Sequence, residues 1–394
     1  MEKKLNILML MDAYLPYVDG VVTCMHNYCL NLKEKGHNVV ALVPNNKKYV
    51  FNEPYEIIPV KSFHVPFLNL NYPIHKYHRR LKEIIKEYNF DIIHVHSPFN
   101  AANYASYIGK FFKIPVVATY HTDFKSIMKS IFKLNAIANS IVRNLGNKFN
   151  RMEEVFVSTP LLADYLKKDY GYKGKISYLN FGTNEKPVKD TSGLISKANE
   201  RFGISSKETV FLTVGRVIKL KRIDMSLNAL KVLKEKGYKF KFFIVGTGSD
   251  LMYFKKYAKR LGFSNEEIIF TGFLSEEDRM LIYARADMFL FPSLFDTFGL
   301  VKMEAACYKV PSVMIENSNS AFGTTDNVNA ILSQDSTEDF ANRIMHYINY
   351  KDELKKIGKN AQKDLYLNWS SATDELLEAY ERIIIDYKQR EHLS

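Results

Sequence analysis

The stretch ADMFLFPSLFDTFGLVKME, residues 286–304, decides the fold. Its first six residues are mostly apolar and predict a buried strand that runs into a turn at Pro292-Ser293. Residues 297–300 then predict a helix start, and Asp296 and Glu304 bracket that start. The free backbone N–H groups of a helix start favour an anion. Carboxylates beside such a site accept hydrogen bonds from hydroxyls, so the stretch suits a nucleotide sugar, which carries both a diphosphate and hydroxyls.

Apolar runs alternate with helical patterns along the rest of the chain. This alternation predicts an α/β protein whose mostly parallel sheets have helices on both faces. The polar segment 181–198 is a candidate linker between two series of strands, and residues 369–392 form one long helical pattern. The predicted strands are 6–11, 37–44, 57–60, 92–96, 116–120, 154–158 and 175–179 in the first series, and 209–214, 239–245, 267–271, 288–291 and 311–315 in the second.

Length and composition limit the classes of protein. A chain of 394 residues suits two domains. The formal charge of +12 is uneven: residues 1–185 hold 24 Lys and Arg against 15 Asp and Glu, giving +9, and the remainder gives +3. Three cysteines without metal spacing indicate a reducing compartment. With no apolar run of about 18–20 residues and no signal peptide pattern, we expect a soluble or peripheral protein.

Further motifs occur in a fixed order around this stretch. They are a glycine loop at 12–23, strand ends at 94–98 and 119–124, Gly215-Arg216 with Lys221, Gly246 with Gly248, and Gly272. Together with the acidic pair, they resemble the family 4 retaining glycosyltransferases of GT-B fold. The resemblance implies two Rossmann-like domains facing a deep cleft. We expect an acceptor domain at 1–184 plus 370–394 and a nucleotide-sugar domain at 185–369. Residues 20–23 and 121–124 resemble those of bacterial 1,2-diacylglycerol 3-glucosyltransferases.

The resemblance assigns roles in binding and catalysis. His121, Arg216, Lys221 and Asp296 are the predicted catalytic residues, with the two cations stabilising the leaving UDP without a metal. Glu304 is expected to accept from ribose hydroxyls. The other predicted donor-binding residues are Gly20, Val21, Gly215, Gly246, Gly272, Phe298, Gly299 and Leu300. Simpler alternatives are a solvated basic turn at 219–222, a plain turn at Asp19-Gly20 and a solvated helix position for Glu304.

Residues 124–152 contain several cations and no acidic residue, with apolar side chains at helical spacing. Such a basic amphipathic segment beside the acceptor site suits an anionic membrane surface. The predicted acceptor and membrane residues are Asp123, Lys125, Lys129, Lys133 and Arg143. The alternative is an ordinary core-facing helix with a basic outer surface. No recognition motif supports a nucleic-acid partner.

The sequence predicts neither a metal nor a cofactor. His94 and His96 share one face of a strand, but no third ligand is apparent, and a structural role is expected for at least one of them. Three departures from the family pattern stand out. Asp296 replaces the usual Glu, Lys309 stands where glycine is common, and residues 318–332 lack an acidic residue near Phe322 and glycines near Asn327 and Ala330.

These observations predict a retaining, metal-independent hexosyltransferase. It would move glucose from a UDP-sugar to diacylglycerol at the cytoplasmic face of the plasma membrane, giving an α-monoglycosyl-diacylglycerol. UDP-galactose is the second donor. Alternatives are the same chemistry on a soluble or cell-wall-polymer acceptor, or a catalytically weak nucleotide-sugar-binding protein. A dehydrogenase is disfavoured because the N-terminal loop has one glycine instead of Gly-x-Gly-x-x-Gly.

Overall fold

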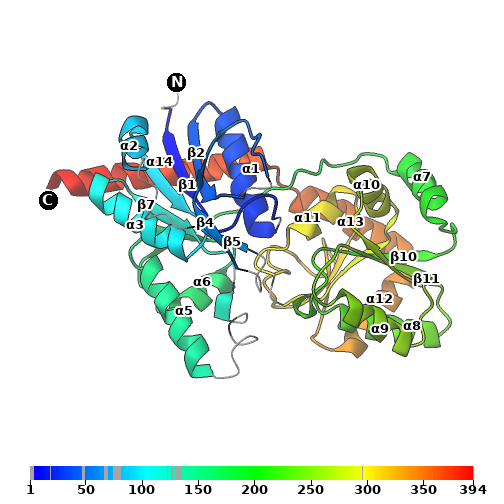
Figure 1. Ribbon diagram of the computed structural model, residues 1–394. Coiled ribbons are helices and arrows are strands. Elements are labelled where there is room, and N and C mark those ends of the chain that lie inside the picture. The colour runs from blue at the N-terminus through cyan, green and yellow to red at the C-terminus, as the bar shows by residue number, and fades with distance from the viewer. Residues whose placement is uncertain are drawn as a thin grey trace. The chain divides into compact units, whose positions relative to one another are not determined.

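The computed structural model divides the chain into two units, each with its own parallel sheet (Figure 1). Unit 1 comprises Met1–Phe181 and Trp369–Ser394, and unit 2 comprises Gly182–Asn368. The structure describes residues 4–17, 19–46, 49–65, 70–73, 81–121, 123–125, 128, 135–294 and 296–393.

In unit 1, the described residues form a sheet of seven parallel strands in the order β3-β2-β1-β6-β7-β8-β9. Strand order reverses between β1 and β6, and open α/β sheets bind ligands at the carboxyl ends of strands at such a point. The strands are β1 (Asn6–Leu10), β2 (Asn38–Pro44), β3 (Glu56–Val60), β6 (Ile92–Val95), β7 (Val116–Thr119), β8 (Glu154–Val157) and β9 (Lys175–Tyr178). An antiparallel pair, β4 (Ser62–Val65) and β5 (Leu70–Pro73), was not predicted.

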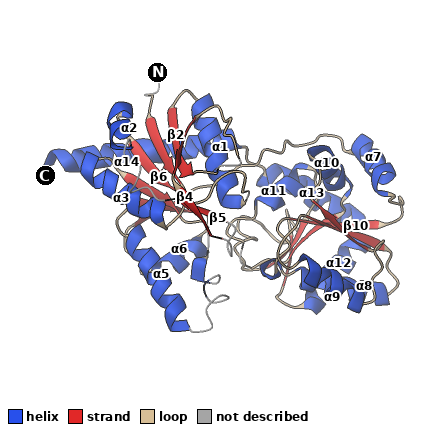
Figure 2. Ribbon diagram, viewed as in Figure 1, coloured by secondary structure: helices blue, strands red, loops and turns tan. Residues whose placement is uncertain are grey.

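Helices cover both faces of this sheet (Figure 2). Successive strand residues point to opposite faces, so Leu8 and Leu10 of β1 join the core under α3, α5 and α6, whereas Met9 contacts Tyr380 of α14. The helices of unit 1 are α1 (Gly20–Glu34), α2 (Leu81–Tyr88), α3 (Asn100–Phe112), α5 (Asn135–Phe149), α6 (Pro160–Lys168) and α14 (Trp369–Leu393).

Unit 2 repeats the same plan with six parallel strands in the order β12-β11-β10-β13-β14-β15. Its strand order reverses between β10 and β13, so the predicted ligand-binding edge follows these strands. The strands are β10 (Thr209–Val214), β11 (Phe240–Val245), β12 (Ile268–Gly272), β13 (Met288–Phe291), β14 (Ser312–Ile315) and β15 (Ile331–Ser333). The predicted α/β class with two Rossmann-like domains is confirmed.

Helices also pack on both faces of the second sheet. Phe211 of β10 joins a core with α8, α9 and α12, and its neighbour Leu212 joins another with α10 and α11. The elements are α7 (Ser192–Phe202), the 3-10 turn η2 (Lys219–Lys221), α8 (Ile223–Glu235), α9 (Leu251–Arg260), α10 (Glu276–Arg285), α11 (Leu300–Cys307), α12 (Thr337–Asn349) and α13 (Lys351–Leu365). None of the helices in the described ranges is long and apolar enough to cross a membrane.

The predicted linker is partly wrong, because α7 begins inside segment 181–198. Polar contacts hold this helix. Arg201 Nε lies 2.9 Å from Asp278 Oδ1, and Arg285 Nε donates to Asn199 Oδ1 at 2.8 Å. Leu194, Ala198 and Phe202 also recur at helical spacing, and Leu194 and Phe202 pack against the unit 2 core, so an apolar signal for this helix is present in the sequence.

Two of the departures from the family pattern lie at unusual backbone positions. Lys309 has a φ of 62° and Asn327 a φ of 60°, both in the left-handed region that favours glycine. The backbone therefore keeps the shape that glycine would give, and Lys309 Nζ donates to the carbonyl of Lys189.

Candidate active site

Three predicted donor-binding glycines meet at the carboxyl edge of the second sheet. The Gly215 N–H donates to the Val245 carbonyl at 2.9 Å, and the Gly246 N–H donates to the Gly272 carbonyl at 2.8 Å. Gly246 has a φ of 125°, and a Cβ there would lie 2.0 Å from the Gly215 oxygen. The backbones of Gly215 and Gly246 can therefore approach this closely only without a side chain at Gly246. This leaves an edge of the sheet that a diphosphate can approach.

A lysine and a carboxylate are paired beside this edge. Lys221 Nζ lies 2.5 Å from Asp296 Oδ1, and each side chain is 21% exposed. The other oxygen, Asp296 Oδ2, is buried without a hydrogen-bond partner among the described residues. The Arg216 side chain is exposed. The pair thus holds a partly shielded cation at this edge, beside a carboxylate whose second oxygen is buried.

Helix α11 starts where the sequence predicts. Gly299 has a φ of 74° and precedes Leu300, the first helical residue. A Cβ on Gly299 would lie 2.7 Å from the Phe291 ring, so glycine is required by both backbone shape and space. Phe298, Gly299 and Leu300 are each partly exposed.

Glu304 of α11 is partly buried and oriented by a tyrosine. Tyr283 donates to Glu304 Oε2 at 2.7 Å. Burial raises the pKa of Glu304, and the Tyr283 hydrogen bond and the Arg279 charge oppose that rise. Arg279 is itself paired with Glu185 at 2.8 Å, and the Tyr308 hydroxyl donates to Glu185 at 2.7 Å. The carboxylate is therefore fixed in position.

Lys302 is a buried residue of the site region that sequence reasoning missed. Its Nζ donates to the carbonyls of Ser320 and Phe322, each at 2.7 Å. Burial lowers the Lys302 pKa to about 7. These hydrogen bonds hold the loop at 318–322 against α11. In the sequence, Lys302 lies between the two acidic residues of the motif, Asp296 and Glu304. A lysine flanked by the apolar residues Leu300, Val301 and Met303 was the available signal.

In unit 1, two aspartates cap helices at the carboxyl edge of the sheet. Asp19 Oδ1 accepts from the N–H groups of Val21 and Val22 at 2.9 Å, so α1 begins at Gly20. A Cβ on Gly20 would meet no atom within 4 Å, which leaves open space there. Asp12 likewise accepts from the Ala101 N–H at 2.9 Å, and burial raises the Asp12 pKa to about 6.

His94 has a structural role. Its Nδ1 lies 2.5 Å from the Tyr380 hydroxyl and its Nε2 lies 2.7 Å from Thr119 Oγ1. Burial lowers the pKa of His94 well below its usual value.

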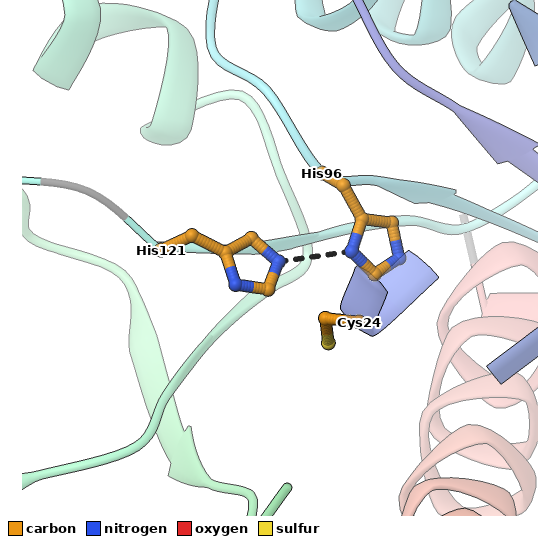
Figure 3. Close-up of side chains that lie close together, drawn as sticks. All are labelled: Cys24, His96 and His121. Carbon is orange, nitrogen blue, oxygen red and sulfur yellow. Dashed lines mark hydrogen bonds between the residues drawn. The ribbon is translucent and has the colours of Figure 1, made fainter. Parts of the chain in front are cut away.

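His96 instead joins His121 and Cys24 (Figure 3). His96 Nδ1 lies 2.9 Å from His121 Nε2, and one ligand atom from each of the three residues lies within 4.8 Å of the others. A metal held by the two facing nitrogens would place a proton on His96 Nε2. That atom is buried without a partner among the described residues, whereas metal-bound imidazoles almost always donate their second N–H to an acceptor. The donor set therefore does not fit a metal.

The predicted acceptor residues are only partly described. Lys129 and Lys133 lie outside the described residues. Lys125 Nζ pairs with Asp169, the Asp123 carboxylate accepts from the Lys125 N–H, and Arg143 is exposed on α5. The apolar side of α5 packs into the unit 1 core through Ala138, Val142, Leu145 and Phe149. In its described part, this helix matches the core-facing alternative with a basic outer surface.

Family comparisons agree with this arrangement. The profile of "Glycosyltransferase Family 4" matches residues 18–185, and that of "Glycosyl transferases group 1" matches residues 195–364. The chain belongs to these glycosyltransferases. Each profile covers most of one unit, so the enzyme class and the two-domain architecture are shown together.

Individual relatives and solved structures extend over nearly the whole chain. An alpha-monoglucosyldiacylglycerol synthase of Streptococcus pneumoniae is 29% identical, covering 90% of this chain and 87% of its own length. That of Acholeplasma laidlawii is 24% identical over 89% and 90%. A glycosyltransferase structure from Rickettsia africae has a TM-score of 0.76 at 22% identity, covering 97% of this chain and 99% of its own. The UDP-glucose complex of Anabaena HepE has a TM-score of 0.75 at 16% identity, covering 95% and 99%.

Proposed function

We propose that this glycosyltransferase moves a hexose, glucose first among the candidates, from a UDP-sugar to diacylglycerol with retention at the anomeric carbon. The observation that carries the donor assignment is the edge of the second sheet. There, three glycine backbones lie beside the Lys221–Asp296 pair. Two alpha-monoglucosyldiacylglycerol synthases with similarity over about nine-tenths of the chain support the acceptor assignment.

The residues of unit 2 suit departure of a diphosphate. As the glycosidic bond breaks, the leaving UDP gains negative charge, and fixed cations at that position lower the barrier. We assign this role to Lys221 and Arg216. Asp296 would accept from a hydroxyl of the sugar, and Glu304 would accept from the ribose hydroxyls. The UDP-glucose complex of Anabaena HepE supports a UDP-sugar in this fold.

From unit 1, we assign two elements to the donor. Gly20 at the start of α1 leaves open space for the diphosphate, whereas the Val21 N–H already donates to Asp19 Oδ1. His121 contacts the sugar through its ring. It is 8% exposed, and burial lowers its pKa to about 3, so its imidazole is neutral at physiological pH.

The lipid acceptor implies work at a membrane surface, and we place the enzyme peripherally at the cytoplasmic face. The excess charge of residues 1–185, +9 of the total +12, supports attraction to anionic lipid. Arg143 on the outer side of α5 belongs to this charge. The contact is electrostatic, since the apolar side of α5 lies in the core.

The deciding experiment is transfer of labelled sugar from UDP-glucose or UDP-galactose to diacylglycerol in anionic vesicles, read by thin-layer chromatography. We expect a labelled monoglycosyl lipid from UDP-glucose and none from the Arg216→Ala or Glu304→Ala variants. The protein should sediment with anionic vesicles at low salt and be released at high salt. UDP binding without lipid product would overturn the diacylglycerol assignment, and product on a soluble or polymeric acceptor would replace it.

A further inference from the structure

We infer that His96 is a positioning residue that fixes the tautomer of His121: His96 donates its Nδ1–H to His121 Nε2, and His121 keeps its proton on Nδ1. His121 then presents an N–H donor to the ligand and no lone pair. This inference deepens the proposed function, on which its assignment of a sugar ligand rests.

Geometry leaves two arrangements for the proton between the rings. The facing nitrogens, His96 Nδ1 and His121 Nε2, are 2.9 Å apart (Figure 3). A hydrogen bond of this length between two neutral imidazoles needs one donor and one acceptor. Both rings are neutral, because burial lowers the pKa of each.

The far nitrogen of His96 decides between them. His96 is 2% exposed, and its Nε2 is buried with no hydrogen-bond partner among the described residues. If His121 donated, His96 would have to carry its own proton on Nε2, leaving a buried N–H donor unpaired. Orphaned buried N–H groups are rare, and under-satisfied acceptors are less so. The bare lone pair therefore belongs on His96 Nε2 and the proton on His96 Nδ1.

The tautomer of His96 determines the tautomer of His121. With Nε2 occupied as an acceptor, its one proton sits on Nδ1. Its ring is also held in place by Phe181, whose ring centroid lies 5.5 Å away in a stacked arrangement. His121 can thus donate to a sugar hydroxyl or phosphate oxygen. It cannot accept the proton of the attacking hydroxyl, so that proton must leave by another group.

Nitrogen-15 NMR of the histidine-labelled full chain tests the tautomers directly, without substrate. The resonances of His96 and His121 are assigned by comparison with single variants. We expect protonated-type Nδ1 and unprotonated-type Nε2 for both rings. Protonated-type Nε2 on either ring would overturn the inference, whatever the enzyme's substrate proves to be.

A pair of variants tests the positioning role. An Asn side chain places its amide donor near the position of Nδ1, while Leu has a similar size and no donor. We expect His96→Asn to keep the His121 tautomer and most activity. His96→Leu should give mixed His121 tautomers and about fivefold to tenfold lower kcat/KM, the value of one hydrogen bond. Equal losses with an unchanged His121 tautomer in both variants would reject the role.

Cys24→Ala is the matched control. It alters the same buried cluster but leaves both imidazoles in place, so the tautomers and the activity should stay as in the wild type. If this variant shifts the His121 tautomer as His96→Leu does, packing and not the hydrogen bond sets the tautomer, and the inference fails.

Discussion

Lys221 Nζ and Asp296 Oδ1 are 2.5 Å apart, although 75 positions separate the two residues in the chain. The contact joins the turn after β10 to the loop after β13, the two strands between which the order of the second sheet reverses. Each group keeps the other at the ligand-binding edge. The salt bridge is thus a means of positioning a cation, and its own contribution to stability is secondary.

We predict that Lys221→Ala lowers kcat by roughly 100- to 1000-fold, because one preorganised charge on the leaving group contributes about this much. Steady-state rates with the labelled donor measure the change. Lys219→Ala, two positions earlier on an exposed side chain, should retain wild-type rates. Similar losses in both variants would indicate a general effect of positive charge and reject the specific role of Lys221.

Tyr283→Phe should weaken donor binding by about fivefold, the value of one hydrogen bond, by freeing the Glu304 carboxylate. The same hydrogen bond opposes the burial that raises the Glu304 pKa. Without it the pKa rises further, and donor binding should decline at a higher pH on the acid side. UDP titrations across pH measure both effects. Tyr308→Phe, which loses Glu185 instead, should leave the profile unchanged.

Lys302→Met should remove a pH dependence of stability. The folded-state pKa is lowered to about 7, so between pH 7 and about 10.4 the unfolded chain binds more protons than the folded one. Stability from this group therefore rises with pH in that window, by at most about 1.4 kcal/mol per unit. Thermal melts of both proteins from pH 7 to 9.5 give the difference. An identical slope in the variant would contradict the prediction.

Gly246→Ala should destabilise unit 2 and abolish UDP binding. The left-handed backbone alone costs roughly 1–3 kcal/mol, and the new Cβ would collide with the Gly215 carbonyl at 2.0 Å. Melting temperature and UDP titration measure the effect. At Gly193 in α7 an added Cβ meets no atom within 4 Å, so Gly193→Ala should melt at or slightly above the wild-type temperature. Retained UDP binding in Gly246→Ala would show that the close approach is dispensable.

Arg382→Ala should cost about 1.5–3 kcal/mol of stability, because it removes two charge-assisted hydrogen bonds from a buried carboxylate and leaves it with Lys175 Nζ at 3.4 Å. Glu154 in β8 is 1% exposed and is bonded by both terminal nitrogens of Arg382, at 2.6 and 2.9 Å. Urea unfolding measures the loss. Arg390 lies on the same helix as Arg382 and forms a more exposed pair with Glu153, so Arg390→Ala should cost less than about 1 kcal/mol. Comparable losses would mean that burial of Glu154 is not the cause.

Much of the fold was predictable, because buried parallel strands are apolar along their whole length and stand out from helical periodicity. Every strand of both parallel sheets except β15 follows from such a run. The three residues of β15 are too short for any period, and the β4–β5 pair lies apart from the main sheet. Helix α7 was missed because its apolar residues, Leu194, Ala198 and Phe202, stand in and beside a polar segment with glycine and proline that resembles a linker.

For the candidate site, spacing along the chain placed Asp296, Gly299 and Glu304 in one segment. It could not show which side chains meet across the fold. Tyr283 reaches Glu304 from another helix, and Cys24 reaches His96 from α1. The two histidines at 94 and 96 look equivalent in sequence. Within the described part of the chain, however, His94 has hydrogen-bond partners at both ring nitrogens and His96 at Nδ1 alone.

Helix α14 closes the first unit with the last residues of the chain. A ribosome delivers the seven strands of that unit first, then all of unit 2, and only at the end the side chains of Arg382 and Tyr380. Until α14 has been synthesised, the Glu154 carboxylate lacks its bond from Arg382 and the His94 imidazole lacks its bond with Tyr380. Unit 2 can thus finish folding before unit 1. A chain that stops before residue 369 would contain all of unit 2 but would lack the helix that completes unit 1, although most of unit 1 is synthesised earlier.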